Sequence, residues 1–198
     1  MPGPPADPPG LPPYDAVILA GGRARRLGGV DKPGLLVGER PMVERVAAAV
    51  AGAEFLVVAG PPRPGLGDAE FVREDPPGSG PVPALRAAMP WIAAPWLALL
   101  AGDLPYVTAA HVDRLREAAS DRDGALFVDD GGREQWLAGV WRTTSLRAAL
   151  EAYTGPSLGG LLRPLDPGRL TSPGDPGPWA DCDTPADLAA ARARAPGV

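Results

Sequence analysis

Cysteine, histidine and lysine each occur once in this 198-residue sequence, as Cys182, His111 and Lys32. A single cysteine excludes an internal disulfide and is typical of proteins from a reducing cytoplasm. The single histidine, His111, lies inside a predicted helix and is expected to be structural, so a Ser-His-Asp set is not expected. Lysine is the most informative of the three, because the other basic residues, among 19 Lys and Arg in total, are all arginines.

Long apolar runs and an excess of basic charge are also missing. No apolar run approaches the roughly 20 residues that span a membrane, and the N-terminus lacks the charged start and apolar core of a secretory signal peptide. The formal net charge is −5 and the sequence pI is ≈ 4.9, which argues against a nucleic-acid-binding face. We therefore expect a cytoplasmic protein with no membrane or nucleic-acid partner.

The order of apolar patterns along the chain predicts its fold class. Residues 1–13 are rich in proline and are expected to form a disordered tail before a single domain of residues 14–198. Strand patterns alternate with helical ones, which favours a mostly parallel sheet between two helical layers. The predicted strands are 15–19, 55–59, 71–72, 96–100, 125–128 and 136–141, and the predicted helices are 41–50, 108–119, 143–153 and 184–194.

Turn residues refine this fold prediction. Pro41 is expected at the first position of its helix, and Thr108, Thr143 or Thr144, and Thr184 are expected as helix caps. Asp-Asp-Gly-Gly at 129–132 indicates a hairpin, so an antiparallel pair is expected within the sheet. Residues 164–178 are rich in Pro and Gly and are predicted to form a loop or a movable lid.

The segment that follows the first predicted strand has the composition of a phosphate-binding loop. Residues 21–32 contain four glycines, three arginines and Lys32. Gly21 and Gly22 can bring backbone N–H groups close to phosphate oxygens, and open α/β sheets bind nucleotides at the carboxyl ends of their strands. A GxGxxG motif is absent, and Lys32 lies between Asp31 and Pro33 rather than in the Gly-Lys-Ser/Thr of a P-loop. The alternative is a surface loop with Gly for turns and Arg for solubility.

The motif Leu-Ala-Gly-Gly-x-x-x-Arg-Leu-Gly-x-x-x-Lys, residues 19–32, resembles the signature of the nucleotidylyltransferases, and Gly-Gly-Val-Asp-Lys resembles the MobA-like branch in particular. The resemblance extends from about residue 15 to 194 and implies a three-layer α/β/α, Rossmann-like nucleotidyltransferase fold with a mostly parallel mixed sheet. It assigns nucleotide contacts to the backbone of Leu19, Ala20 and Gly21, and phosphate contacts to Arg26 and Lys32. Two further arginines, at 23 and 25, are either functional or solvated.

A carboxylate at the end of a buried strand indicates a metal site. The apolar run 96–101 is followed by Gly102 and Asp103, and a carboxylate at the carboxyl edge of a central strand is a suitable ligand for Mg²⁺. A turn or cap role for Asp103 is the alternative, but Thr108 is better placed to cap. The resemblance supports the metal role, since this motif matches the family's metal-binding Asp.

Three further segments gain roles from the resemblance. Asp75 matches an acidic nucleotide contact, and Gly80 begins the family's Gly-Pro-Leu-Ala-Gly, of which the final glycine is missing here. Asp183, in Asp-Cys-Asp-Thr-Pro, either joins the metal site or holds the substrate, with a simple helix cap as the alternative. Gln135 lies in a strand that the resemblance places beside the acceptor pocket.

The function that the resemblance implies is transfer of GMP from Mg-GTP to the phosphate of molybdopterin, with release of pyrophosphate. GTP and molybdopterin would be the substrates, with transient contacts to other cofactor-biosynthesis proteins or a molybdoenzyme chaperone. The open alternatives are CTP as donor, a sugar phosphate or phospholactate as acceptor, or a catalytically silent nucleotide-binding partner. Leu-Ala-Gly-Gly favours GTP, since the cytidylyl branch tends to have Leu-Ala-Ala-Gly.

Overall fold

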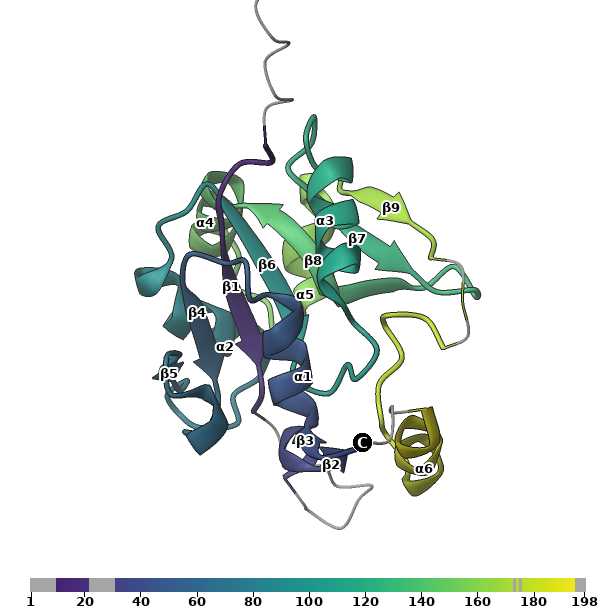
Figure 1. The fold of residues 1–198 in the computed structure, drawn as a ribbon. Coiled ribbons are helices and arrows are strands. Elements are labelled where there is room, and N and C mark those ends of the chain that lie inside the picture. Colours follow the sequence, from purple (N-terminus) through teal and green to yellow (C-terminus); the bar gives the residue numbers. More distant parts are fainter. Residues whose placement is uncertain (1–9, 22–30, 173, 175, 195–198) are drawn as a thin grey trace, which may run out of the picture.

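The computed structural model describes residues 10–21, 31–172, 174 and 176–194. Within these residues, seven strands form one mixed sheet in the order β5-β4-β1-β6-β8-β7-β9 (Figure 1). Strands β5, β4, β1 and β6 are parallel to one another, as are β7 and β9, whereas β8 is antiparallel to both β6 and β7. The strands are β1 (Tyr14–Leu19), β4 (Leu56–Ala59), β5 (Glu70–Val72), β6 (Trp96–Ala101), β7 (Gly124–Val128), β8 (Glu134–Arg142) and β9 (Gly168–Leu170).

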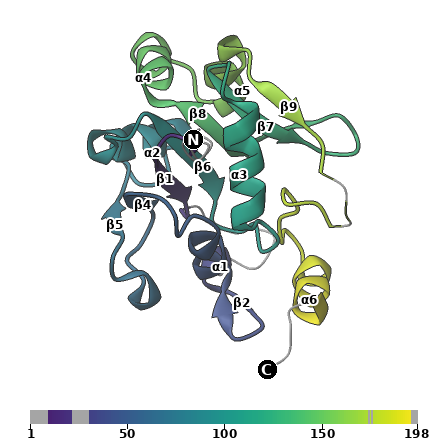
Figure 2. The same cartoon turned by 45° about the horizontal axis from the view of Figure 1, so that its top comes forward.

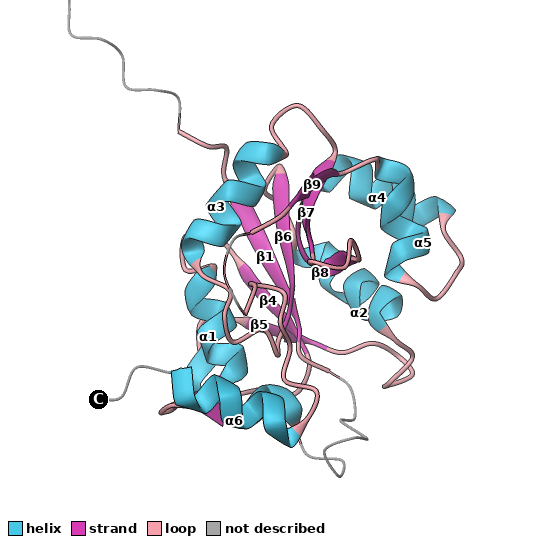
Figure 3. Cartoon of the chain, turned by 90° about the vertical axis from the view of Figure 1, so that its right-hand side faces the viewer, coloured by secondary structure: helices cyan, strands magenta, loops and turns pink. Residues whose placement is uncertain are grey.

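Helices cover both faces of this sheet, which confirms the three-layer prediction. Helices α1 and α3 pack on one face, and α2, α4 and α5 pack on the other (Figure 3). Figure 2 views the molecule from the side of α1 and α3. The helices are α1 (Met42–Ala49), α2 (Pro81–Ala88), α3 (Ala109–Ala118), α4 (Thr143–Ala152), α5 (Leu158–Leu162) and α6 (Pro185–Arg194).

Alternation along the central strands explains why the sheet is buried on both sides. In β1, Ala16 and Ile18 belong to the core shared with α1 and α3, whereas Val17 belongs to the core shared with α2, α4 and α5. Successive side chains of a strand point to opposite faces, so a strand with apolar residues at every position needs a helical layer on each side. β1 and β6 are therefore apolar at nearly every position, because each strand packs against helices on both faces of the sheet.

Helix α6 lies apart from these layers, beside a small hairpin formed by β2 (Leu36–Val37) and β3 (Arg40–Pro41). Cys182 is fully buried there with Met42 and Leu188. Burial raises the pKa of the Cys182 thiol to about 11, so this thiol is protonated near neutral pH and serves as a small apolar side chain. The contact holds the chain just before α6 against the start of α1.

Several sequence predictions of local structure were confirmed. Thr108 caps α3, and the His111 ring accepts from the backbone N–H of Thr108 at 3.2 Å. At the start of α6, the backbone N–H of Asp187 donates to the hydroxyl of Thr184 at 3.2 Å. The hairpin between β7 and β8 turns at residues 129–132, where Gly132 has a φ of 79°. Only the part of the predicted tail beyond residue 9 falls within the described residues.

Other local predictions were wrong. Pro41 precedes α1 and pairs in β3 instead of beginning the helix. Neither Thr143 nor Thr144 caps α4, because Arg142 precedes the helix and the buried hydroxyl of Thr143 donates to the carbonyl of Ala94 at 2.7 Å. The segment 164–178 is not wholly a loop, since β9 extends the sheet by pairing with β7. Helices α2 and α5 were not predicted, because proline and glycine interrupt their short apolar patterns.

No helix among the described residues is both long enough and apolar enough to cross a bilayer.

Candidate active site

Three chain segments meet closely where β1 ends. The backbone N–H of Ala20 donates to Ala59 at 2.9 Å, and that of Gly102 donates to Leu19 at 2.9 Å. A Cβ on residue 60 would lie 2.9 Å from the Ala20 carbonyl, and a Cβ on residue 102 would lie 3.0 Å from the Ala20 side chain. A side chain at residue 60 would therefore push the end of β4 away from the end of β1, and one at residue 102 would require Ala20 to shift.

Lys32 lies at the centre of the charged part of this edge. It opens a short 3-10 helix, η2 (Lys32–Gly34), and is only 8% exposed. Its Nζ lies 2.5 Å from Asp103 and 2.6 Å from Asp183. Burial alone would lower the pKa of Lys32, but its hydrogen bonds to these two carboxylates outweigh burial and raise the pKa above its ordinary value. The ammonium is therefore charged near neutral pH.

A third carboxylate completes this cluster. Asp103, Asp181 and Asp183 each offer one oxygen, and these oxygens all lie within 4.8 Å of one another. Burial raises the pKa of Asp181, against the opposing effect of Lys32. Asp103 and Asp183 were predicted as metal ligands, whereas Asp181 was not. Its position two residues before Asp183 was the available signal, since residues at i and i+2 share a side in extended backbone.

The segment before Lys32 is held by an arginine from a distant loop. Arg63, which follows β4, donates Nη1 to Asp31 at 2.6 Å and Nη2 to the other oxygen of Asp31 at 2.7 Å. A Cβ on residue 34 would lie 2.3 Å from this carboxylate and 2.9 Å from Arg63, so Gly34 leaves room for the pair. A bidentate pair of this kind restrains both partners, and it therefore orients the start of η2 and Lys32. No sequence motif indicated a role for Arg63.

A cavity of about 1010 Å³ opens beside these groups. The order of the strands divides the residues that line the cavity into two groups. β1 and β6 are central in the sheet, β4 lies beside β1, and β8 lies beside β6. We call the part on the β4 side the glycine arm, lined by Leu19, Gly21, Ala59, Glu74, Gly78, Gly80, Pro81 and Ala84. We call the other part the β8 arm, lined by residues 133–138 and 156–160 and by Arg163. Lys32, Asp103, Asp181 and Asp183, which we call the acidic end, also line the cavity.

The structure brings most of the described predicted residues to this one cavity. Leu19, Gly21, Lys32, Gly80, Asp103, Gln135 and Asp183 all line it. Ala20 is buried behind the wall, and its N–H is used within the sheet. Gln135 donates its amide to Asp129 at 2.8 Å, which orients it in the β8 arm. The predicted contacts at Gly22 and Arg26, with the arginines at 23 and 25, lie outside the described residues.

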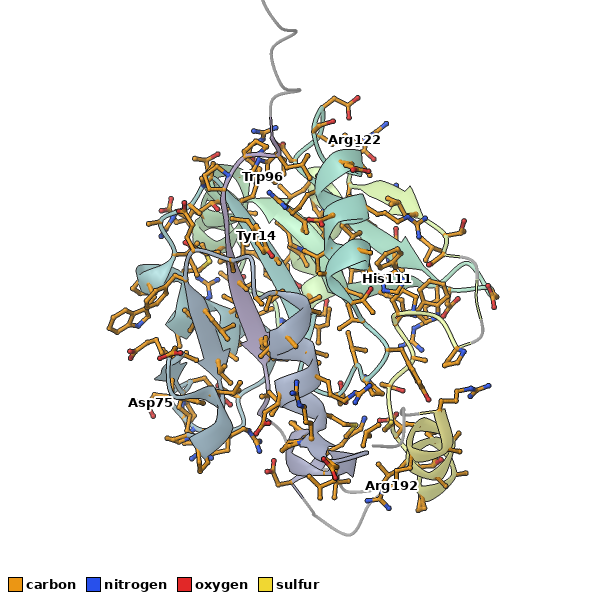
Figure 4. The ribbon with its side chains drawn as sticks, in the orientation of Figure 1. Tyr14, Asp75, Trp96, His111, Arg122 and Arg192 are labelled. Carbon is orange, nitrogen blue, oxygen red and sulfur yellow. The ribbon has the colours of Figure 1, made fainter. Side chains whose placement is uncertain are left out.

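The predicted acidic contact at Asp75 is not part of the cavity wall. Asp75 is exposed, and Figure 4 shows it on the β5 side of the molecule, opposite to Arg192 on α6. The preceding residue, Glu74, lines the glycine arm, and its Oε1 accepts from the backbone N–H of Gly78 at 2.7 Å. Sequence alone could not choose between two adjacent acids, because neighbouring side chains in an extended segment point in opposite directions.

Comparisons with known proteins agree with this geometry. Residues 16–168 match the family model described as the MobA-like NTP transferase domain. The molybdenum cofactor guanylyltransferase of Rhodobacter capsulatus is 32% identical over 90% of this chain and 94% of its own. A protein of Mycobacterium marinum, named a probable molybdenum cofactor guanylyltransferase, is 33% identical over 88% of this chain and 90% of its own.

Solved structures share the fold at lower identity. The molybdopterin-guanine dinucleotide biosynthesis protein A of Archaeoglobus fulgidus is 18% identical, with a TM-score of 0.69 over 90% of this chain and 97% of its own. The 2-C-methyl-D-erythritol 4-phosphate cytidylyltransferase of Thermus thermophilus is 22% identical, with a TM-score of 0.68 over 91% of this chain and 98% of its own. One fold thus carries different donors and acceptors, so the choice of substrates depends on the residues that line the cavity.

Proposed function

We propose that this chain, which belongs to the family of MobA-like NTP transferases, transfers GMP from GTP to the phosphate of molybdopterin and releases pyrophosphate. The observation that carries the proposal is the acidic end, where Lys32 and three carboxylates meet at the carboxyl edge of the central strands. This cluster lies on the wall of a cavity with an arm on each side of it. Two substrates could therefore approach the same charged centre from opposite sides.

The curated relatives support GTP as the donor and molybdopterin as the acceptor. They are named guanylyltransferases of the molybdenum cofactor, and the alignments cover most of both chains. In the glycine arm, the Glu74 carboxylate supports guanine in particular, because an acceptor of two hydrogen bonds suits the N–H donors on the pairing edge of that base. We propose Glu74 as the acidic nucleotide contact, next to the Asp75 assigned from the sequence.

In the proposed reaction, an oxygen of the acceptor phosphate attacks the α-phosphorus of GTP, the bond from that phosphorus to the β-phosphate oxygen breaks, and pyrophosphate leaves. The attacking group is already an anion, so the step needs no strong general base. It needs charge neutralisation and alignment of two phosphates that repel one another. Lys32 supplies positive charge at the acidic end, and the backbone at Gly21 lies in the wall where the phosphates would pass.

The acidic end also fits a divalent cation. Three carboxylates carry more negative charge than Lys32 alone neutralises, and their oxygens are the hard donors that Mg²⁺ prefers. Asp103, Asp181 and Asp183 would hold the ion. When bound, Mg²⁺ would act as a Lewis acid that neutralises phosphate charge. The ion pairs of Lys32 with Asp103 and Asp183 orient two of these carboxylates.

The test is pyrophosphate release with GTP, CTP, ATP and UTP, each with and without molybdopterin, in the presence of Mg²⁺. We expect release that depends on both GTP and molybdopterin. Release only with CTP, or only with a sugar phosphate or phospholactate, would replace the substrates but keep the chemistry. If no pair of substrates gives pyrophosphate release, the proposal is overturned, and a catalytically silent nucleotide-binding role would remain.

The proposal extends to the setting of the enzyme. We place it in the cytoplasm, with transient contacts to other cofactor-biosynthesis proteins or a molybdoenzyme chaperone that pass on a labile acceptor and product. The buried thiol of Cys182 and the family membership support this placement. Sedimentation of the purified protein with such a partner should show a weak complex, and two independent boundaries would count against the contact.

A further inference from the structure

The β8 arm ends in a group of arginines arranged around one carboxylate and one indole. A recess of about 370 Å³ is lined by Gly132, Arg133, Glu134, Trp136, Arg163 and Arg169. Arg133, Glu134, Trp136 and Arg163 also line the main cavity. We call Arg133, Glu134, Trp136, Arg163 and Arg169 the basic corner. Glu134 and Trp136 lie in β8, Arg133 directly precedes β8, Arg163 directly follows α5, and Arg169 lies in β9, so only the folded chain brings them together.

Glu134 holds two arginines of the basic corner at once. Its Oε2 accepts from Arg163 at 2.8 and 3.2 Å, and its Oε1 accepts from Arg169 at 2.7 and 2.9 Å. The side chain of Glu134 is 14% exposed, whereas those of Arg163 and Arg169 are 64% and 45% exposed. The hydrogen bond from Arg163 is the main cause that lowers the pKa of Glu134. The mostly buried Glu134 carboxylate therefore fixes the orientation of two more exposed guanidinium groups at the recess.

Trp136 provides a flat wall beside these charges. The Arg163 guanidinium carbon lies 5.4 Å from the centre of the Trp136 ring, and the Trp141 ring lies 6.3 Å away at an interplanar angle of 24°. A Cβ on residue 159 would lie 3.0 Å from the Trp136 indole nitrogen. Gly159 therefore lets the indole pack against α5, and a planar cation is held against a planar ring at the cavity wall.

Among the residues that line the recess, arginines outnumber carboxylates by three to one, with Arg133, Arg163 and Arg169 against Glu134. Two further carboxylates lie outside that lining: Oδ1 of Asp166 is 3.7 Å from Arg169, and Oδ1 of Asp129 accepts from the backbone N–H of Arg133 at 2.9 Å. Arginine forks suit anions and planar groups with several acceptor atoms, because they donate in a fixed plane. The excess of arginines among the lining residues and the flat wall together indicate a ligand that is planar and negatively charged.

We propose that the basic corner binds the end of the acceptor that is remote from the phosphate accepting GMP, and that this end is a planar ring system bearing negative charge. Arg163 and Trp136 contact it directly, and Glu134 is a positioning residue that acts through Arg163 and Arg169. The inference rests on the proposed function, since it assumes that the acceptor occupies the β8 arm. It adds the residues that select the acceptor, which in molybdopterin would meet the pterin and its dithiolene.

The test compares Arg163→Ala and Glu134→Gln with the wild-type protein, using molybdopterin and GTP. A lost hydrogen bond to a charged group weakens binding by about 10- to 100-fold, so we expect the KM for molybdopterin to rise by that factor in Arg163→Ala. Glu134→Gln should raise the same KM by less, with the KM for GTP unchanged in both variants. Calorimetric titration of molybdopterin into the GTP-free protein should show the same loss of affinity.

Arg142→Ala is the matched control for these variants. Arg142 also lies over a tryptophan, 4.5 Å from the Trp96 ring centre, and pairs with Asp123 at 3.1 Å, but neither arginine nor tryptophan lines the cavity. Its loss should lower thermal stability without changing the KM for molybdopterin. If Glu134 acts through the arginines, Glu134→Gln should add little to the KM of an Arg163→Ala, Arg169→Ala background.

The outcomes separate the two proposals. If the wild-type protein turns over molybdopterin and Arg163→Ala keeps the wild-type affinity for it, the inference about the basic corner is wrong while the proposed function stands. If Glu134→Gln lowers only the melting temperature, its carboxylate is structural and the positioning role is wrong. If the wild-type protein neither binds nor turns over molybdopterin, the proposed function itself fails.

Discussion

The acidic end and the basic corner are arranged in opposite ways around one cavity. At the acidic end, a single ammonium, that of Lys32, lies among three carboxylates. In the basic corner, a single carboxylate, that of Glu134, lies among three arginines, of which it binds two. The first arrangement leaves negative charge for a cation to neutralise, and the second leaves positive charge for an anion.

This difference indicates how one cavity could align two anionic substrates. A compact ammonium neutralises part of the acidic end and leaves a defined place for a hard cation. The arginine forks of the basic corner suit a broad, planar group instead. The acidic end and the basic corner would hold the acceptor by its different chemical groups.

The largest effect is expected from Asp103→Ala, which removes the carboxylate at the end of β6. Loss of one contact that stabilises developing charge commonly costs about 10²–10³ in rate, so kcat should fall at least that far in a pyrophosphate-release assay. The melting temperature should change little, because Lys32 keeps its pair with Asp183. Asp121→Ala, which removes an exposed carboxylate that does not line the cavity, is the control, and near-native turnover of Asp103→Ala would contradict the assignment.

Lys32→Ala should lose at least about 10²-fold in turnover for the same reason, and it should also make stability depend on metal. Without the ammonium, three carboxylates within 4.8 Å repel one another in a partly buried site. Added Mg²⁺ should therefore raise the melting temperature of Lys32→Ala more than that of the wild-type protein. Lys32→Met separates loss of charge from loss of packing, and a variant whose melting temperature does not respond to Mg²⁺ would contradict the cation site.

Glu74→Gln should weaken the preference for guanine. The amide keeps the shape of the side chain but places a donor where guanine N–H groups need an acceptor, so kcat/KM for GTP should fall by roughly 10-fold or more. Asp75→Asn is the matched change on the adjacent exposed acid and should have a smaller effect. If Asp75→Asn lowers kcat/KM for GTP more than Glu74→Gln does, Asp75 is the nucleotide contact, as the sequence indicated.

Arg63→Ala should raise the KM for GTP with a smaller change in kcat. Arg63 does not line the cavity, and it pairs with Asp31 directly before η2, so its loss should allow Lys32 to move before substrate binds. Ordering one side chain on binding costs about 0.5–1.5 kcal/mol, which is about 2- to 10-fold in affinity. Arg63→Lys keeps the charge without the fork and should be intermediate. A fall in kcat alone would show that Arg63 does not position the site.

The smallest effect concerns acid stability of the basic corner. The pKa of Glu134 is lowered in the folded chain by its hydrogen bonds to Arg163 and Arg169. A lowered pKa stabilises the fold above the ordinary value of 4.5, and that contribution is lost as the pH falls through the folded pKa. Glu134→Gln should thus have a lower melting temperature than the wild-type protein at pH 7. The loss of unfolding free energy should be about 1 kcal/mol or less. Plots of melting temperature against pH for the two proteins should converge below pH 4.5. A difference in melting temperature that stays the same at all pH values would contradict a stabilising role of the ion pairs.

Much of the site was predictable because its elements are local in the sequence or follow from strand order. The glycine-rich segment after β1, Lys32, and the carboxylate after β6 were all identified from short motifs. Parallel strands place their carboxyl ends at one edge of the sheet, so Lys32 and Asp103 were expected at the same edge. Apolar runs with turn residues at their ends predicted six of the strands, and β9 was missed because Gly-Arg-Leu has no such pattern.

The remaining choices depended on contacts between distant segments. Lys32 and Asp183 are 151 residues apart, and nothing local indicates that Asp181 joins them or that Arg63 binds Asp31. The choice of Glu74 over Asp75 depends on the direction of one extended segment, which the packing of α2 and β5 sets.

The sequence by itself determined the α/β class, the place of the lone lysine after a glycine-rich segment, and the family, because each depends on residues that are close together in the chain. Only the tertiary structure decided which charges meet. The net charge of the acidic end and of the basic corner is a sum over β6, β8, β9, η2 and the segment before α6. Coulomb interactions depend on distance in space, and that distance exists only once the sheet order is formed.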